Sequence, residues 1–115
     1  MTQYSRGYAF EQKCAGVLTQ DGYFCVRSGG SHGVADLVAL KPGQVLLIQA
    51  KTDGKTTLAA WNQLVATANR VGAVPLIASR PKRGVVEFWR PLGPRLPRQA
   101  GVYEVWKADE VASDG

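Results

Sequence analysis

The sequence predicts an α/β fold in which a central mixed sheet of five strands is flanked by helices. Apolar residues recur at helical spacing in two segments, and short runs of β-branched and aromatic residues lie between turn signals elsewhere. One helical segment separates two strand-like runs, as the crossover of a mixed sheet requires. With 115 residues, 45% of them hydrophobic, the chain is long enough for one compact domain over residues 1–115.

The first helix and the first strand are expected near the N-terminus. Apolar positions at helical spacing predict a helix over residues 6–18, with Ser5 capping its start. Asp21 and Gly22 form a turn signal that ends this helix. The aromatic and β-branched residues 23–27 then predict a strand.

A hairpin is expected in the middle of the chain. Residues 34–40 and 45–51 are two apolar runs, and the short connection between them contains Pro42 and Gly43. Such a tight connection is typical of antiparallel strands. The Gly- and Ser-rich residues 28–33 form a loop before this hairpin.

The second half of the chain adds a helix and further strands. Either Thr56 or Thr57 can cap a helix that carries an apolar stripe and ends near Gly72. The remaining strands are expected over residues 73–79 and 85–90, with a short edge strand over residues 102–106.

The cysteines and aromatic residues are interpreted as structural. Cys14 and Cys25 lack metal-ligand spacing, and His32 is the single histidine, so both cysteines are expected to be reduced thiols. The expected core residues are Tyr8 and Phe24, and the expected core or dimer-interface residues are Trp61, Trp89 and Trp106.

The positive charge suggests an anionic partner. The chain carries a formal net charge of +5, and it has neither the apolar run of a membrane helix nor a signal peptide. We therefore expect an intracellular protein without a membrane partner. If the basic residues share one face, they would bind phosphates without reading bases. The candidate phosphate-binding residues are Arg6, Lys13, Arg27, Ser28, His32, Lys55, Arg80, Lys82 and Arg83.

Polar side chains within the predicted hairpin mark the candidate site. Asp36 interrupts an apolar run, and a carboxylate there requires compensation by a cation or hydrogen bonds. Gln49 and Lys51 project to one face of the adjoining strand, and antiparallel pairing brings them beside Asp36. Carboxylate and amide oxygens suit a hard divalent cation, and an adjacent lysine can position a water. This arrangement favours phosphodiester hydrolysis.

The same residues resemble a known nuclease signature. Asp36 followed by Gln49-Ala50-Lys51 is similar to the PD-(D/E)xK motif, with glutamine at the second acidic position. The wider order of elements resembles the archaeal-type Holliday junction resolvases from about residue 6 to residue 90. The features that carry this wider resemblance are Gly7, Phe10 and Glu11, the Gly/Ser loop, the hairpin, Gln63 on a helix, and residues 74–78.

The resemblance implies a restriction-endonuclease-like fold and a single nuclease domain. It implies a homodimeric endonuclease that cuts four-way DNA junctions with Mg²⁺, for which Mn²⁺ can substitute. It also implies a cytoplasmic protein encoded by an archaeon, a bacterium or a phage. By position, the inherited catalytic residues are Glu11, Asp36, Gln49, Lys51 and the loop residue Ser31, with Ser28 as the alternative serine; the implied metal ligands are Asp36, Gln49 and Glu11.

Gln49 departs from the pattern because it keeps an oxygen ligand but removes a negative charge. Three explanations are open: a natural glutamine-tolerant enzyme, an engineered inactive variant, or a DNA-binding descendant that no longer cleaves. Two alternatives to the junction-resolving enzyme also stay open. These are a non-cleaving junction- or DNA-binding module and a repair nuclease that cuts ordinary duplex DNA.

Overall fold

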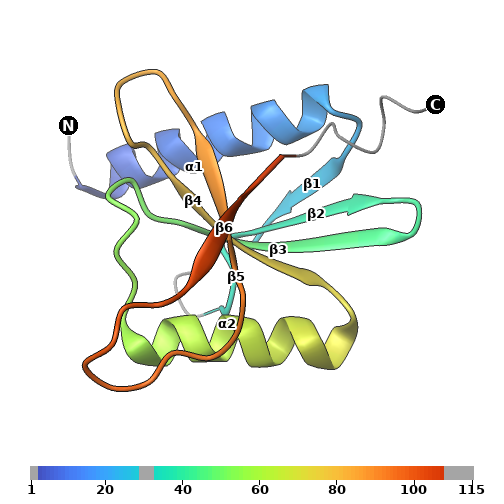
Figure 1. Ribbon diagram of the computed structural model, residues 1–115. Coiled ribbons are helices and arrows are strands. Elements are labelled where there is room, and N and C mark those ends of the chain that lie inside the picture. The colour runs from blue at the N-terminus through green and yellow to red at the C-terminus, as the bar shows by residue number, and fades with distance from the viewer. Residues whose placement is uncertain (1–2, 29–32, 108–115) are drawn as a thin grey trace.

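Two helices enclose a single sheet (Figure 1). The computed structural model describes residues 3–28 and 33–107, with the side chains of the first helix described from residue 7 onward. Helix α1 (Gln3–Gln20) lies on one face of the sheet and α2 (Leu58–Val71) on the other. The strands, in sheet order, are β1 (Phe24–Arg27), β2 (Leu37–Lys41), β3 (Gln44–Ala50), β4 (Val74–Ser79), β5 (Glu87–Pro91) and β6 (Tyr103–Trp106).

The prediction of five strands was wrong, because the described residues form a six-stranded sheet. The additional strand is β6, which pairs antiparallel with β5 at the sheet edge. Ring contacts hold it there: Trp89 stacks on Tyr103 at 4.5 Å, and Trp106 meets Phe88 edge-on at 6.0 Å. The short edge strand expected over residues 102–106 is thus present as β6, and ring packing against β5 stabilises it at the sheet edge.

The predicted hairpins and crossover are confirmed. Strands β2 and β3 pair antiparallel from Leu37↔Ile48 to Lys41↔Gln44, and β4 and β5 also pair antiparallel. Gly43 has a φ of +77°, which a residue without a Cβ adopts easily in the two-residue turn. Strand β4 runs parallel to β3, and α2 makes the connection between them.

The helix ends agree with the sequence at α2 and differ at α1. Thr57 caps α2 by accepting a hydrogen bond from the Ala60 amide at 3.1 Å, and Gly72 ends it with a φ of +75°. Helix α1 begins at Gln3, so Ser5 lies within the helix and the predicted cap was wrong. In the described part of the chain, neither helix combines the length and the apolar character that crossing a membrane demands.

The core consists of two apolar clusters, one on each face of the sheet. The α1 side is centred on Phe10, Cys14 and Leu18, and the α2 side on Trp61 and Leu64. Both cysteines are free, as expected. The expected core positions of two aromatic residues were wrong: Tyr8 is 42% exposed and Phe24 is 68% exposed. Phe24 lies on an edge strand, on the side of β1 that faces away from the α1 cluster.

Candidate catalytic and nucleic-acid-binding site

Asp36 lies immediately before β2, so the predicted strand over residues 34–40 begins three residues later than expected. Its backbone N–H donates to the Ile48 carbonyl at 2.8 Å, which continues the β2–β3 ladder by one bond. Its carboxylate Oδ2 then accepts from the Ala50 N–H at 2.8 Å. The chain leaves the sheet here, and the side chain of Asp36 replaces the backbone partner that Ala50 would otherwise lack.

Gln49 is buried at the end of β3, with 8% of its surface exposed. Its neighbours Ile48 and Ala50 pack in the α1 cluster, so strand alternation directs Gln49 to the α2 side. Its Nε2 donates to the Val34 carbonyl at 2.9 Å, while its Oε1 is buried and has no hydrogen-bond partner among the described residues. A buried acceptor without a donor costs about 1–3 kcal/mol.

Lys51 follows β3 directly, and its side chain is exposed. Its backbone N–H donates to the Ala78 carbonyl at 2.8 Å, which fixes the position of its Cα against β4. Three polar groups therefore meet at this end of β3: the carboxylate of Asp36, the buried amide of Gln49 and the exposed ammonium of Lys51.

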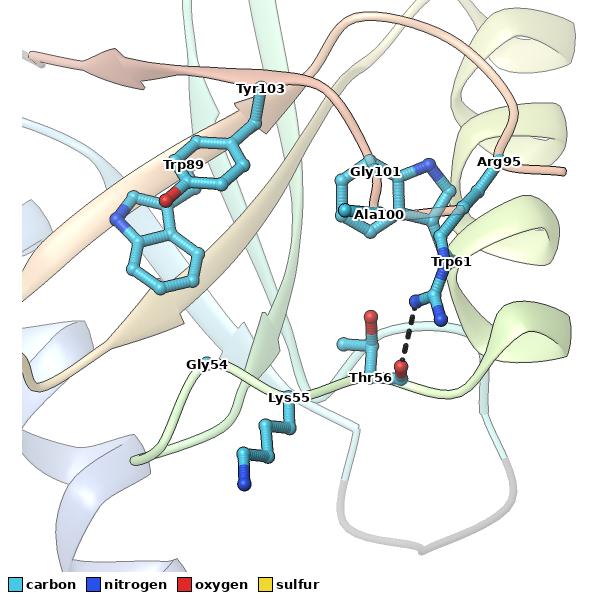
Figure 2. A pocket seen from close by; sticks show the side chains of 9 residues that line it. All are labelled: Gly54, Lys55, Thr56, Trp61, Trp89, Arg95, Ala100, Gly101 and Tyr103. Atoms are coloured by element: carbon cyan, nitrogen blue, oxygen red, sulfur yellow. Dashed lines mark hydrogen bonds between the residues drawn. The ribbon is translucent and has the colours of Figure 1, made fainter. Parts of the chain in front are cut away.

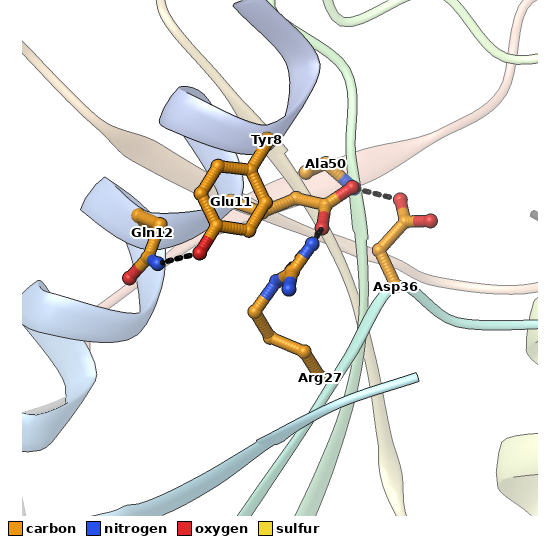
Figure 3. A network of polar contacts seen from close by, with 6 residues as sticks. All are labelled: Tyr8, Glu11, Gln12, Arg27, Asp36 and Ala50. Atoms are coloured by element: carbon orange, nitrogen blue, oxygen red, sulfur yellow. Dashed lines mark hydrogen bonds and ion pairs between the residues drawn. The ribbon is translucent and has the colours of Figure 1, made fainter. Parts of the chain in front are cut away.

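Glu11 approaches this end of the sheet from α1, where Arg27 of β1 neutralises it (Figure 3). Arg27 donates to Glu11 Oε1 through Nη2 at 2.8 Å and through Nε at 3.2 Å. The guanidinium also lies 4.2 Å from the centre of the Tyr8 ring, a cation–π contact. Tyr8 in turn accepts from Gln12 at 2.5 Å, so a chain of contacts holds the Glu11 carboxylate in place.

The two carboxylates share an electrostatic neighbourhood. The pKa of the Cys14 thiol is raised to about 12, chiefly by burial and in addition by the negative charges of Glu11 and Asp36. Both carboxylates therefore act on the same buried thiol. Figure 3 shows the Glu11 and Asp36 side chains reaching toward the Ala50 backbone from α1 and from the segment before β2.

The predicted phosphate-binding residues fall into three groups. Arg27 is half-buried and occupied by Glu11. The Arg6 side chain and His32 lie outside the described residues, as does Ser31, which was predicted as a catalytic residue. The exposed members are Lys13, Ser28, Lys55, Arg80, Lys82 and Arg83.

Several participants in the site were not predicted. Tyr8 supports Arg27, and the Val34 carbonyl and the Ala50 amide bind Gln49 and Asp36. Backbone groups carry no sequence signal of their own, and the Glu11–Arg27 pair joins elements that only the tertiary fold brings together. Opposite charges facing one another across α1 and β1 are the signal that could have suggested this pair.

The donor atoms at this site suit a hard divalent cation. Two carboxylates and one amide oxygen are the ligand types that Mg²⁺ and Mn²⁺ accept, usually together with waters and phosphate oxygens. Within the described ranges, no group of three or more His, Cys, Asp and Glu side chains is arranged to hold a metal ion. A cation here would therefore depend on the Gln49 amide or on oxygens from a substrate.

Comparison with known proteins identifies the fold and the family. A family model described as archaeal Holliday junction resolvase (Hjc) matches residues 2–111. The crossover junction endodeoxyribonuclease Hjc of Methanocaldococcus jannaschii is 41% identical over 54 residues, which are 47% of this chain and 40% of that protein. The aligned part thus spans less than half of that curated relative.

A solved structure supports the same fold. Archaeoglobus fulgidus Hjc, a Holliday junction resolvase, superposes with a TM-score of 0.74 at 22% identity, covering 92% of this chain and 99% of that chain. At this level of identity the likeness establishes architecture, and it confirms the restriction-endonuclease-like fold that the resemblance implied.

The Glu11–Arg27 pair should contribute measurably to stability. Arg27→Met keeps an apolar stem but leaves the half-buried Glu11 carboxylate without its cation, so we expect the free energy of unfolding in urea to fall by about 1–2 kcal/mol. Arg90→Met is the matched control because the Arg90–Glu104 pair is about half exposed, and its loss should cost less than about 0.5 kcal/mol. Equal losses in the two variants would contradict a structural role for the pair.

Proposed function

Because the chain belongs to the archaeal Holliday junction resolvase family, whose model matches residues 2–111, we propose that it is a metal-dependent endonuclease that resolves four-way DNA junctions. The reaction is the hydrolysis of one phosphodiester bond in each of two opposed strands. We also propose that residues 1–115 form one nuclease domain, with the site at the end of β3 as its catalytic centre.

One observation carries this proposal: the fixed carboxylate of Asp36 beside Gln49 and Lys51. The Ala50 N–H holds Oδ2 of Asp36 at 2.8 Å, so the orientation of this carboxylate is set before any ligand arrives. Pre-orientation of this kind reduces the cost of assembling a site around a phosphate. Asp36 would hold the cation through its carboxylate, together with the amide oxygen of Gln49.

The unpartnered Oε1 of Gln49 fits this role. It is a buried acceptor for which the described residues provide no donor, and a cation shared with Asp36 would satisfy it. We propose Mg²⁺, for which Mn²⁺ can substitute, because all of the available donors are oxygens. When bound, the cation supplies charge stabilisation for the scissile phosphate.

The charged residues around Asp36 have complementary roles. The exposed ammonium of Lys51 can orient the attacking water and stabilise charge on a phosphate oxygen. Glu11 can serve as a further ligand, but the positive charge of Arg27, which binds Glu11 Oε1, weakens its attraction for a cation while the pair is intact. A DNA phosphate placed near Arg27 offers the guanidinium an alternative partner, and DNA binding would thereby free Glu11.

Sequence-tolerant DNA contacts would come from the exposed basic residues, chiefly the turn between β4 and β5 with Arg80, Lys82 and Arg83. Contacts of this kind bind phosphates and weaken steeply with salt. Ser28 lies beside the site, where its backbone N–H donates to the Asp36 carbonyl at 3.0 Å.

A non-cleaving DNA-binding protein on the same fold is the second candidate function. Two observations favour it: Gln49 carries no charge, and Glu11 is already neutralised by Arg27. A nuclease that cuts ordinary duplex DNA would use the same residues, and the choice of substrate separates it from a resolvase.

We propose that the functional unit is a homodimer. Two active sites held by one symmetry axis match the two opposed strands of a junction. Phe24, Val26 and Leu40 form an exposed apolar face on β1 and β2, which we call the β1–β2 face. Helix α2 packs on β3 and β4, and β1 is the edge strand of the sheet, so the β1–β2 face is free to meet a second copy.

Cleavage of a four-way junction tests the proposed function. In Mg²⁺ or Mn²⁺ we expect paired nicks in the junction and little cutting of linear duplex. Asp36→Asn and Lys51→Met should each lower the cleavage rate by roughly a hundredfold, and Asp36→Asn should leave junction binding in EDTA little changed. Lys107→Met, an exposed lysine beyond β6, is the control. Junction binding without nicks in Mn²⁺ would support the non-cleaving protein, and equal cutting of duplex would support the duplex nuclease.

Gln49→Glu tests the assignment of the cation site. A carboxylate cannot donate to the Val34 carbonyl, so in EDTA we expect the free energy of unfolding to fall by about 1–3 kcal/mol. Added Mg²⁺ or Mn²⁺ should raise the melting temperature of Gln49→Glu more than that of the original protein, because the new charge strengthens cation binding. Gln63→Glu on the exposed surface of α2 is the control. If Gln49→Glu changed neither cation binding nor the cleavage rate, Gln49 would not be a ligand.

The β1–β2 face predicts how the subunits associate. We expect the original protein to sediment as a dimer of the 12.4 kDa chain, and Phe24→Ser to shift it toward the monomer. Val71→Ser removes an equally exposed apolar side chain from the end of α2 and should leave the mass unchanged. A monomeric mass for the original protein at working concentration would contradict the dimer.

A further inference from the structure

An aromatic pocket lies on the α2 side of the sheet, next to the proposed catalytic centre. It has a volume of about 400 Å³, and we define it by Gly54, Lys55, Trp61, Trp89, Arg95 and Tyr103. Figure 2 shows Trp89 and Tyr103 on one side, Trp61 and Arg95 on the other, and the loop with Gly54 and Lys55 across the base. None of the residues of the proposed catalytic centre lines this pocket.

The walls of the pocket are fixed aromatic rings. Trp89 and Tyr103 stack at 4.5 Å with an interplanar angle of 16°. The Trp89 Nε1 donates to Glu87 at 2.6 Å, and the Trp61 Nε1 donates to the Gly93 carbonyl at 2.8 Å. Both indole N–H groups are therefore satisfied within the protein, and Tyr103 remains 42% exposed. Trp61 is only 5% exposed, so the ring surface that the pocket offers to a ligand comes from Tyr103 and the partly exposed Trp89.

Glycines let the backbone lie directly against two of these rings. A Cβ at Gly54 would overlap the Trp89 ring, and a Cβ at Gly101 would overlap the Trp61 ring. Gly54 also has a φ of +73°, a conformation that residues with a side chain rarely adopt. The backbone thus lies directly against both indoles, and a side chain at Gly54 or Gly101 would force the neighbouring ring to move.

The charges around the pocket are positive. Lys55 and Arg95 are the two ionised residues among those that line it. Arg95 is committed to the fold, because it donates to the Thr56 and Gln99 carbonyls at 3.0 Å. Lys55 is exposed, and Figure 2 shows its side chain directed away from the rings. An anionic group at the rim could therefore be bound by Lys55 while an attached flat group occupies the pocket.

The pocket lies close in the chain to Lys51 of the proposed catalytic centre. The Gly54 N–H donates to the Lys51 carbonyl at 2.7 Å, so a single tight turn separates Lys51 from the base of the pocket. A DNA strand whose phosphate lies at Lys51 passes close to this opening.

We propose that the aromatic pocket binds one unpaired nucleobase of the DNA strand that enters the catalytic centre, with the base stacked on an aromatic ring and its phosphate near Lys55. Stacking of this kind tolerates any base, because every base has a π-face. It would hold a nucleotide at the branch point, where pairing is interrupted, and so favour branched over continuous duplex DNA. This inference rests on the proposed function in one respect: the bound base is assigned to the DNA strand that the enzyme cuts.

Photochemical crosslinking tests the placement of the base. Four-way junctions carrying 5-iododeoxyuridine at each nucleotide next to the exchange point are bound in EDTA, irradiated, and mapped by mass spectrometry. We expect a crosslink to Tyr103, Trp89 or Trp61 from at least one position. Crosslinks found only at residues outside the pocket, or none at all, would overturn the proposal. This measurement uses the unaltered protein, so it does not depend on the folding of a variant.

Binding of a short oligothymidylate measures the contribution of each group. Tyr103→Leu should weaken affinity about tenfold, and Tyr103→Phe should keep it, because the ring and not the hydroxyl makes the stack. Lys55→Gln should lower the salt dependence by about one phosphate contact. Val71→Ala, far along α2 from the pocket, is the control. Unchanged affinity in Tyr103→Leu would count against the pocket.

The proposed function and the pocket can fail separately. Junction nicking in Mg²⁺ without a crosslink to the pocket would remove the base-binding proposal and leave the nuclease intact. A crosslink to the pocket in a protein that never nicks would remove the nuclease and leave the nucleobase site.

Discussion

The hydrogen bond from the Ala50 N–H to the Asp36 carboxylate is the contact on which the rest of the site depends. Strand β3 lies between β2 and β4, so its last residues need partners on both edges. On the β4 edge the Lys51 N–H supplies one by donating to Ala78 at 2.8 Å. On the β2 edge the chain has already left the ladder, and Asp36 completes it with a side-chain oxygen. The same bond closes the sheet and aims the carboxylate, which ties the fold and the proposed chemistry to one residue.

Gln49 has a similar double function, and its two functions conflict. Its side-chain N–H donates to the Val34 carbonyl in the segment before β2, and a glutamate could not donate that bond. Its oxygen is left as a buried acceptor without a donor among the described residues, and an amide ligand binds a cation less strongly than a carboxylate. Glutamine therefore favours the stability of the chain without a cation, whereas glutamate would favour the cation-bound state. The identity of residue 49 sets the balance between these two states.

The sequence predicted the hairpins, the α2 caps and the crossover because their signals are local. Thr57, Gly72 and the Pro42-Gly43 turn each act through their own backbone geometry. Contacts between distant segments were not predictable in this way. Helix α1 does not start at its serine, and Arg27 was expected to face DNA although Glu11 binds it. The aromatic pocket was not predictable for the same reason, because residues 54, 61, 89 and 103 are brought together only by the folded sheet and by the 92–102 connection.

The charges of the site are balanced before any ligand binds. Glu11 pairs with Arg27, and Asp36 accepts from the N–H of Ala50, the residue that precedes the exposed Lys51. A divalent cation that binds alone is repelled by the positive charges of Arg27 and Lys51. A phosphate that binds alone is repelled by the carboxylates of the site. Adding both restores the balance, because the phosphate attracts Arg27 and Lys51 while the cation attracts Asp36 and the released Glu11. Cation and DNA should therefore each strengthen the binding of the other. A site whose charges balance without ligands therefore binds the divalent cation and the DNA phosphate best when both are present, and hydrolysis requires both.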